Sequence, residues 1–285
     1  MNLIAIKDLL AKSCPRTLFH YTTQVGMIGI FSEGEIWATL SHFLNDASEL
    51  LHAKEVAKQV VEGLITNTRD SQELTLLEHM LEAIPLAGIN IAVSSFSEKG
   101  DSLSQWRGYS GNGTGFAIGF DSSQLRDIVE KSEYVLAPCV YDDAKQFDLM
   151  KRIVEECLVK NKELKAAKTY DEENRGGDFQ HYLQQYGLIF KNKSFEEEAE
   201  WRLISKPISY SHKQMTFRPG RTTIIPYDRV KLRGADNKLP ISSIVVGPTP
   251  VPKLAQQAAI GICYRYDSRL VAPNIGNSVI PFRNL

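Results

Sequence analysis

The sequence predicts an α+β protein, because helices gather early and in the middle of the chain while strands recur around them. The segments show no strict strand–helix–strand alternation, which a doubly wound parallel fold would require. Strands dominate the last third of the 285 residues. No repeat or low-complexity linker divides the chain. We therefore expect a single domain over 1–285.

The N-terminal third predicts mainly helices. The stretch MNLIAIKDLLAKSCP carries acid and lysine within its apolar run, which favours an amphipathic helix over 1–16 rather than a signal peptide. A β-rich run TLFHYTT follows, then a short helix, a turn at Glu33-Gly34 and a strand. Asn45 or Asp46 is expected to cap a helix that runs to about Leu64.

The next helix begins at Asp70, which forms a capping-box pattern with Glu73, and ends near Pro85. Beyond it, apolar periodicity and turn residues predict the remaining elements. The expected strands are 89–97, 114–121, 198–205, 222–228, 241–248 and 277–283, and the expected helices are 101–110, 142–168, 178–191 and 252–266. The two central helices form a helical insertion over 143–190.

The composition narrows the class of protein. Hydrophobic content of 43% and charged content of 24% are ordinary for a globular chain. A net charge of -1 argues against a general nucleic-acid binder. Residues 206–238 are locally basic, and could hold a pyrophosphate, contact a nucleic acid or form a solvated face. The four cysteines are widely spaced and no stretch reaches the length of a membrane span, so we expect a cytoplasmic protein without a membrane partner.

The stretch SFEEEAEWRLIS places charge beside an apolar segment. At period two, Trp201 and Leu203 fall on one face, and Glu198, Glu200 and Arg202 fall on the other. A strand therefore gives the two glutamates one shared location, whereas a helix would point them apart. The alternative is structural: a solvated turn, followed by a Glu200–Arg202 ion pair.

Two other strands carry polar side chains. His20 and Thr22 share one face of the TLFHYTT run, with Tyr21 on the other face, and Ser95 and Ser97 share a face of SSFS. A single histidine or a small hydroxyl side chain on a strand usually has only a structural role. The loop GYSGNGTGFAIGF is rich in glycine, but it follows a helix and opens a strand, which is the reverse of a dinucleotide fingerprint. A tight turn is the favoured interpretation.

The order of these segments resembles the ADP-ribosyltransferase superfamily, whose three core strands present a His or Arg, a Ser or Tyr, and a Glu. The chain as a whole more closely resembles the bacterial domain-of-unknown-function family 2971. The matching pieces lie between Leu18 and Arg283; they are FHYTT, LNDASE, SSFSEKGDSLSQWRGYSGNGTGFAIGFD, EEEAEWRLIS and SVIPFR.

The resemblance implies an ADP-ribosyltransferase-like split mixed β-sheet core with flanking helices, and NAD as the substrate. Glu200 would bond the 2′-hydroxyl of the nicotinamide ribose, and Glu198 would orient the acceptor or a water molecule. His20 would bind the adenosine ribose. The implied NAD-binding residues are His20, Tyr21, Thr22, Ser95, Ser97, Trp106, Tyr109 and Arg202.

The implied chemistry has a physical reason. Breaking the nicotinamide bond develops positive charge on the ribose, and a carboxylate placed beforehand stabilises that transition state. No metal is expected. The resemblance suggests a bacterial toxin or anti-phage effector that modifies a macromolecular acceptor (protein or nucleic acid) or hydrolyses NAD, with a regulator or antitoxin protein encoded elsewhere.

The sequence is also compatible with two other functions. Asp46, Glu49, Glu198 and Glu200 could together hold a metal ion in a nuclease, if these distant acids converge. The same fold could also be a nucleotide-sensing module that binds NAD without cleaving it.

Overall fold

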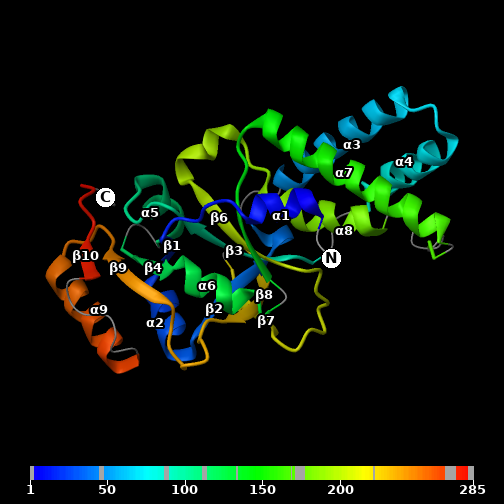
Figure 1. Ribbon diagram of the computed structural model, residues 1–285. Helices are drawn as coiled ribbons and strands as arrows, with labels where there is room; N and C mark the ends of the chain where they lie inside the picture. Colours follow the sequence, from blue (N-terminus) through cyan, green and yellow to red (C-terminus); the bar gives the residue numbers. More distant parts are fainter. Residues whose placement is uncertain are drawn as a thin grey trace.

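The computed structural model describes residues 3–44, 48–86, 90–110, 114–132, 134–167, 169–170, 177–220, 222–266 and 274–281. Within these ranges the chain is α+β, with a mixed, mostly antiparallel, open sheet of ten strands (Figure 1). The strands are β1 (Thr17–Thr22), β2 (Glu35–Leu40), β3 (Ala92–Ser97), β4 (Phe116–Asp121), β5 (Tyr134–Pro138), β6 (Glu200–Ser205), β7 (Met215–Pro219), β8 (Ile224–Lys231), β9 (Ile241–Val246) and β10 (Ile275–Asn277).

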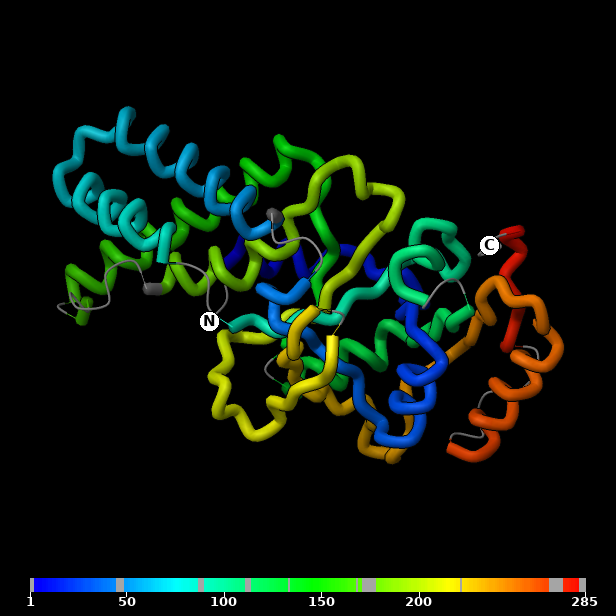
Figure 2. Tube along the Cα trace, turned by 180° about the vertical axis from the view of Figure 1, so that it is seen from behind, coloured from blue at the N-terminus to red at the C-terminus, as the bar shows by residue number. Residues whose placement is uncertain are grey.

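Helices cover both faces of this sheet. The α-helices are α1 (Ile4–Leu10), α2 (Gln24–Glu33), α3 (Ser48–Asn67), α4 (Ser71–Ala83), α5 (Leu103–Tyr109), α6 (Ser122–Val129), α7 (Asp143–Ala166), α8 (Gly177–Tyr186) and α9 (Pro252–Tyr266), and the 3₁₀ turns are η1 (Ser41–Phe43), η2 (Gly187–Ile189) and η3 (Lys193–Glu198). Figures 1 and 2 show α3, α4, α7 and α8 grouped at one side of the molecule, and α9 with β10 at the other.

The sheet divides at β3. Strand β6 pairs with one edge of β3, from Val93 to Ser97. Two strands share the other edge, since β2 pairs with Ala92 and Val93 while β1 pairs at Ser97. One branch continues from β2 through β8 to β7, and the other from β1 through β4 and β9 to β10. The sheet therefore branches at β3, and β5 pairs with the other edge of β6.

A separate apolar core lies on each face of β3 and β6. Val93 and Ile204 pack against the helices of the α3, α4, α7 and α8 group, together with α1. Phe96 and Trp201 face the other way, into a core that includes residues of α2, α6 and α9. Because successive strand residues alternate between faces, polar residues of β3 and β6 can also be assigned to one core or the other.

Most of the predicted elements are present. The Glu33-Gly34 turn is confirmed, because Gly34 ends α2 in the left-handed conformation with φ 70°. Asp70 caps α4 by accepting from the backbone N–H groups of Gln72 and Glu73. The second half of the predicted capping box is absent, since the Glu73 carboxylate instead accepts from Lys162 Nζ at 2.6 Å.

Several boundaries differ from the predictions. The N-terminal helix is shorter than 1–16, and β6 begins at Glu200, after a 3₁₀ turn that contains Glu198. The strand expected over 277–283 is wrong, because β10 ends at Asn277. The sequence analysis did not predict α6, β5 or β7. Asn45 and Asp46, the expected caps of α3, lie outside the described residues.

Among the helices of the described ranges, none combines the length and apolarity that crossing a lipid bilayer requires.

Candidate functional site

Five charged side chains meet on the α3 side of β3 and β6. They come from three distant parts of the chain: Glu49 of α3, Lys191 after η2, Glu198 of η3, and Glu200 and Arg202 of β6. Their side-chain exposures lie between 4% and 12%. We call this group the ionic cluster. The group contains three carboxyl groups and two cations, and burial raises the pKa of one of the carboxyl groups, that of Glu49.

Arg202 is saturated by its neighbours. Its Nε donates to Glu200 Oε1 at 2.8 Å and its Nη2 donates to Glu200 Oε2 at 3.1 Å and Glu49 Oε1 at 2.9 Å. Its Nη1 donates to Glu49 Oε2 and to the Leu188 carbonyl. All five N–H donors of a guanidinium are thereby used. Arg202 is therefore a structural centre and has no donor left for a cofactor, which corrects its expected role in NAD binding.

Lys191 joins the two glutamates of the SFEEEAEWRLIS stretch. Its Nζ donates to Glu198 Oε2 at 2.6 Å and to Glu200 Oε2, and lies 3.9 Å from Glu49 Oε1. Glu198, with 12% exposure, is the most accessible member of the ionic cluster. It is also the least bonded carboxylate, because no described residue donates to its Oε1.

The local backbone explains how Glu198 and Glu200 reach one place without lying on one strand. Ala199 adopts the left-handed conformation with φ 43°, which ends η3 immediately before β6 begins at Glu200. Ser97 Oγ donates to the Glu198 carbonyl at 2.7 Å and accepts from the Lys99 amide at 3.1 Å. The expected strand arrangement of the two glutamates is therefore wrong, although both side chains meet at Lys191.

The neighbouring charges fix the protonation of the ionic cluster. Burial by itself would raise the pKa of Glu200, but Arg202 and Lys191 outweigh burial and lower that pKa to about 2. Burial likewise would lower the pKa of Lys191, and Glu200 outweighs it, so the pKa is raised. Glu200 and Lys191 are therefore both ionised at neutral pH.

Aromatic residues lie beside the ionic cluster. Burial, followed by the charges of Glu198 and Glu200, raises the pKa of the Tyr109 phenol, which is 41% exposed at the end of α5. The Tyr141 hydroxyl accepts from the Glu200 backbone N–H at 2.7 Å. Tyr109 is thus the aromatic ring of the predicted site that combines proximity to the glutamates with exposure to solvent.

His20 lies on the other face of the sheet. Phe19 pairs with Ser97, and Ser97 pairs with Glu200, so these three side chains share a face. His20, one residue on, projects oppositely, and its ring lies 5.7 Å from that of Phe96. The expected juxtaposition of His20 and Glu200 is thus corrected: the sheet separates them.

The hydrogen bond of His20 is also structural, because Nδ1 donates to the Ser95 carbonyl at 2.9 Å. Burial lowers the pKa of His20. Thr22 shares the His20 face at the end of β1, whereas Ser95, which pairs with Arg202, lies on the face of the ionic cluster. The predicted residues are therefore divided, with Ser95, Ser97, Tyr109, Glu198, Glu200 and Arg202 on one face and His20 and Thr22 on the other.

Trp106 and Tyr21 belong to a small core beside α5. Trp106 is fully buried, and its ring lies 4.6 Å from that of Tyr21 in an edge-on arrangement. Asp101 Oδ1 accepts from Trp106 Nε1 at 2.6 Å and from Ser278 Oγ at 2.6 Å. Trp106 therefore offers no exposed ring for stacking, and Asp101 connects α5 to the C-terminal segment.

Three of the four acids proposed for a metal-dependent nuclease lie close together. Glu49, Glu198 and Glu200 gather, but the positions between them hold the Lys191 ammonium and the Arg202 guanidinium. In the described ranges, no three His, Cys, Asp or Glu side chains are arranged to hold a metal ion. Asp46 lies outside those ranges.

Lys191 is the member of the ionic cluster that the sequence analysis missed. It ends an apolar run, GLIFK, seven residues before Glu198, and nothing in that pattern distinguishes it from a solvated lysine.

These features define an α+β protein with a buried ionic cluster at the branch point of a split sheet. Residues 105–203 match the profile of a family described as "Protein of unknown function (DUF2971)". That region contains every member of the ionic cluster except Glu49, and it supports the expected family resemblance over a narrower range than Leu18–Arg283. No curated protein and no solved structure matches the chain, so the comparisons do not support the wider resemblance to ADP-ribosyltransferases.

Proposed function

We propose that the surface around Glu198 and Tyr109 is the active site of an enzyme that cleaves the nicotinamide–ribose bond of NAD. The ADP-ribose would pass to a macromolecular acceptor or to water. The observation that carries the proposal is the pair Glu198 and Glu200, which Lys191 binds together on one side of β3 and β6.

Glu198 is the carboxylate that we assign to the substrate. Its Oε1 receives no bond from a described residue and its side chain is partly accessible, whereas Glu200 is buried and bonded through both oxygens. Positive charge develops on the ribose as nicotinamide leaves, and an ionised carboxylate lowers the energy of that state.

Glu200 would then be a positioning residue. It fixes the Lys191 ammonium through Oε2, and Lys191 in turn holds Glu198 at 2.6 Å. Ser97 Oγ fixes the backbone of Glu198 by donating a hydrogen bond to its carbonyl. A carboxylate held in this way is oriented before the substrate arrives, which is the condition for electrostatic catalysis.

Tyr109 is suited to the leaving group. Its ring is partly exposed, and burial and the charges of both glutamates raise the pKa of its phenol, so it could stack on a planar nicotinamide. His20 has no part in this proposal, because its side chain is on the opposite face of the sheet. The adenosine ribose would need another binding group.

The proposal includes an ADP-ribosyltransferase-like core. The adjacency of β1, β3 and β6 and the split at β3 support it. Consuming NAD or modifying a macromolecule harms a cell, so such an enzyme would suit a toxin or anti-phage effector under the control of a separate regulator.

The test is to incubate the full chain with NAD labelled in its adenylate half, with and without bacterial lysate. We expect free nicotinamide, with the label on a macromolecule or as free ADP-ribose, and no effect of a chelator. Intact NAD would contradict the proposal. Saturable binding without nicotinamide release would indicate a sensing module, and chelator-sensitive nucleic-acid cleavage would indicate the nuclease.

A further inference from the structure

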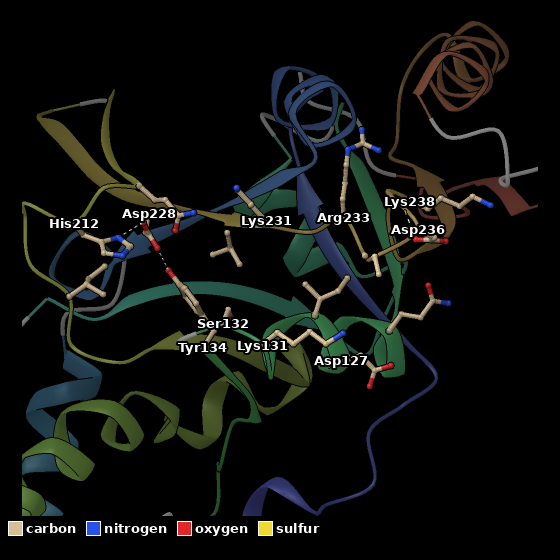
Figure 3. Close-up of a pocket in the computed structure, with 17 residues that line it drawn as sticks. Asp127, Lys131, Ser132, Tyr134, His212, Asp228, Lys231, Arg233, Asp236 and Lys238 are labelled. Atoms are coloured by element: carbon tan, nitrogen blue, oxygen red, sulfur yellow. Dashed lines mark hydrogen bonds and ion pairs between the residues drawn. The ribbon is translucent and has the colours of Figure 1, made fainter.

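A second region with the character of a ligand site lies on the opposite face of the sheet from the ionic cluster. It is a cavity of about 800 Å³ between α6 with the loop that follows it, β8, and the turn after β8 (Figure 3). Tyr134 in its wall pairs with Ser205 of β6. Side chains alternate along a strand, so Ser205 and Tyr134 lie on the same face as Trp201, opposite the face of Glu200. The volume is within the range of small-molecule sites, about 300–1,000 Å³.

Four cationic side chains, those of Lys131, Lys231, Arg233 and Lys238, line this cavity, together with the acids Asp127, Asp228 and Asp236. Lys131, Lys231 and Lys238 are exposed, and none of their ammonium groups pairs with a carboxylate of the described ranges. Arg233 also lines it and donates to two backbone carbonyls, those of Asn237 and Phe31. Figure 3 shows Lys131 and Lys231 on opposite walls, and Arg233 and Lys238 toward one end.

The opposite end of the cavity carries a hydrogen-bonded acid and imidazole. Asp228 is only 1% exposed. Its Oδ2 accepts from the Tyr134 hydroxyl at 2.6 Å, and its Oδ1 accepts from His212 Nδ1 at 3.2 Å. Burial, followed by the Asp228 charge, raises the pKa of Tyr134, so the phenol remains a donor. Asp228 thus holds His212 in the tautomer that leaves Nε2 free to accept a hydrogen bond or a proton.

Apolar residues complete the lining between these two ends. Ile128, Ile208 and Val230 lie among the charged side chains. A ligand pocket that combines apolar surface with a few fixed polar groups suits a small molecule with a flat or aliphatic part and a charged part.

We propose that this cavity binds a nucleoside diphosphate or a phosphorylated small molecule of that size. Lys131, Lys231 and Lys238 would hold the phosphates, because ammonium groups are point charges suited to phosphate oxygens. The apolar residues would contact the base or sugar, and His212 would hydrogen-bond the ligand at the other end. This site is independent of Glu198 and Glu200, since the sheet lies between them.

The test is calorimetric titration of the full chain with ADP, inorganic pyrophosphate and adenosine. We expect one saturable ADP site, weaker binding of pyrophosphate and none of adenosine. Lys231→Glu, and separately Lys131→Glu, should weaken ADP binding at least about tenfold, the effect of removing one charge-assisted contact. Lys253→Glu is the matched control, because Lys253 is an exposed lysine of α9 outside the cavity.

Circular dichroism of each variant is the control for folding and should show the parent spectrum. The proposal is overturned if ADP does not saturate the protein at millimolar concentration, if adenosine binds as tightly as ADP, or if Lys253→Glu weakens binding as much as Lys231→Glu.

Discussion

At the scale of single residues, Arg202 and Lys191 determine what the glutamates can do. A buried carboxylate is costly unless cations and hydrogen bonds compensate it. Arg202 compensates Glu200 and Glu49 through two bonds to each, and Lys191 bridges Glu200 to Glu198. One carboxylate is left with an oxygen that no described residue bonds, which is why we assign the chemistry to Glu198.

The pKa of Glu200 predicts how stability depends on pH. Its value is about 2 in the folded protein against an ordinary 4.5, so Glu200 stabilises the fold above pH 4.5, and this contribution is lost as the pH falls from 4.5 through 2. The shift corresponds to about 3 kcal/mol. Because part of this contribution remains at pH 3, urea unfolding at pH 6 and pH 3 should show the parent losing about 2 kcal/mol more stability than Glu200→Gln. Equal losses would show that Glu200 keeps an ordinary pKa.

At the scale of secondary-structure elements, the approach of β1 to β4 depends on Gly115. A Cβ at this position would lie 2.1 Å from the Thr22 carbonyl oxygen, which is backbone and cannot move aside cheaply. Gly108, in α5, has no such neighbour within 4 Å. Close packing at the entrance to β4 therefore explains Gly115, one glycine of the glycine-rich loop.

We expect Gly115→Ala to lower the free energy of unfolding by about 2 kcal/mol or more, because the two strand ends must separate. Gly108→Ala should leave it unchanged or raise it by up to about 1 kcal/mol, since alanine favours a helix. Thermal unfolding of both variants measures the difference. Similar melting temperatures for the two would mean that the close approach does not exist.

The elements show what the sequence could predict. Strong periodicity predicted α3, α4, α7, α9, β3 and the β6 region correctly. The short elements α6, β5 and β7 carry little pattern of their own and depend on the sheet and helices around them. Glu198 fits the period-two pattern, yet Ala199 takes the left-handed conformation, which is uncommon for a residue with a Cβ and could not be anticipated.

At the scale of the whole molecule, contacts between distant segments decide the site. The alternation within each strand was predictable, but the register of β1 on β3 was not. A shift of one residue would have placed His20 on the face of Glu200. The gathering of Glu49, Lys191 and Arg202 also depends on how α3 and η2 dock on the sheet, which local pattern does not encode.

The C-terminal segment is another long-range connection. Asp101 accepts from Ser278 Oγ and, through Oδ2, from the Val279 N–H at 2.9 Å, while Ile280 packs against the Tyr21 and Trp106 core. The described part of the SVIPFR piece, residues 278–281, is thus joined to α5 through Asp101.

Asp101→Asn should loosen this connection, because an amide is a weaker acceptor than a carboxylate. We expect hydrogen exchange at the Val279 amide to become about tenfold faster, equivalent to the loss of one charge-assisted hydrogen bond. Asp148→Asn, at an exposed position of α7, is the control and should change nothing there. Unchanged exchange at Val279 in Asp101→Asn would show that other contacts hold the segment.

The most direct test of the assignment of Glu198 is the rate of nicotinamide release from NAD by two neighbouring variants. Glu198→Gln keeps the shape of the side chain and removes its charge, whereas Glu197→Gln does the same at an exposed position outside the ionic cluster. We predict a fall of at least about 100-fold for Glu198→Gln, as for the loss of one electrostatic group at a reacting centre, and the parent rate for Glu197→Gln. An active Glu198→Gln, or an equal fall in both folded variants, would contradict the account.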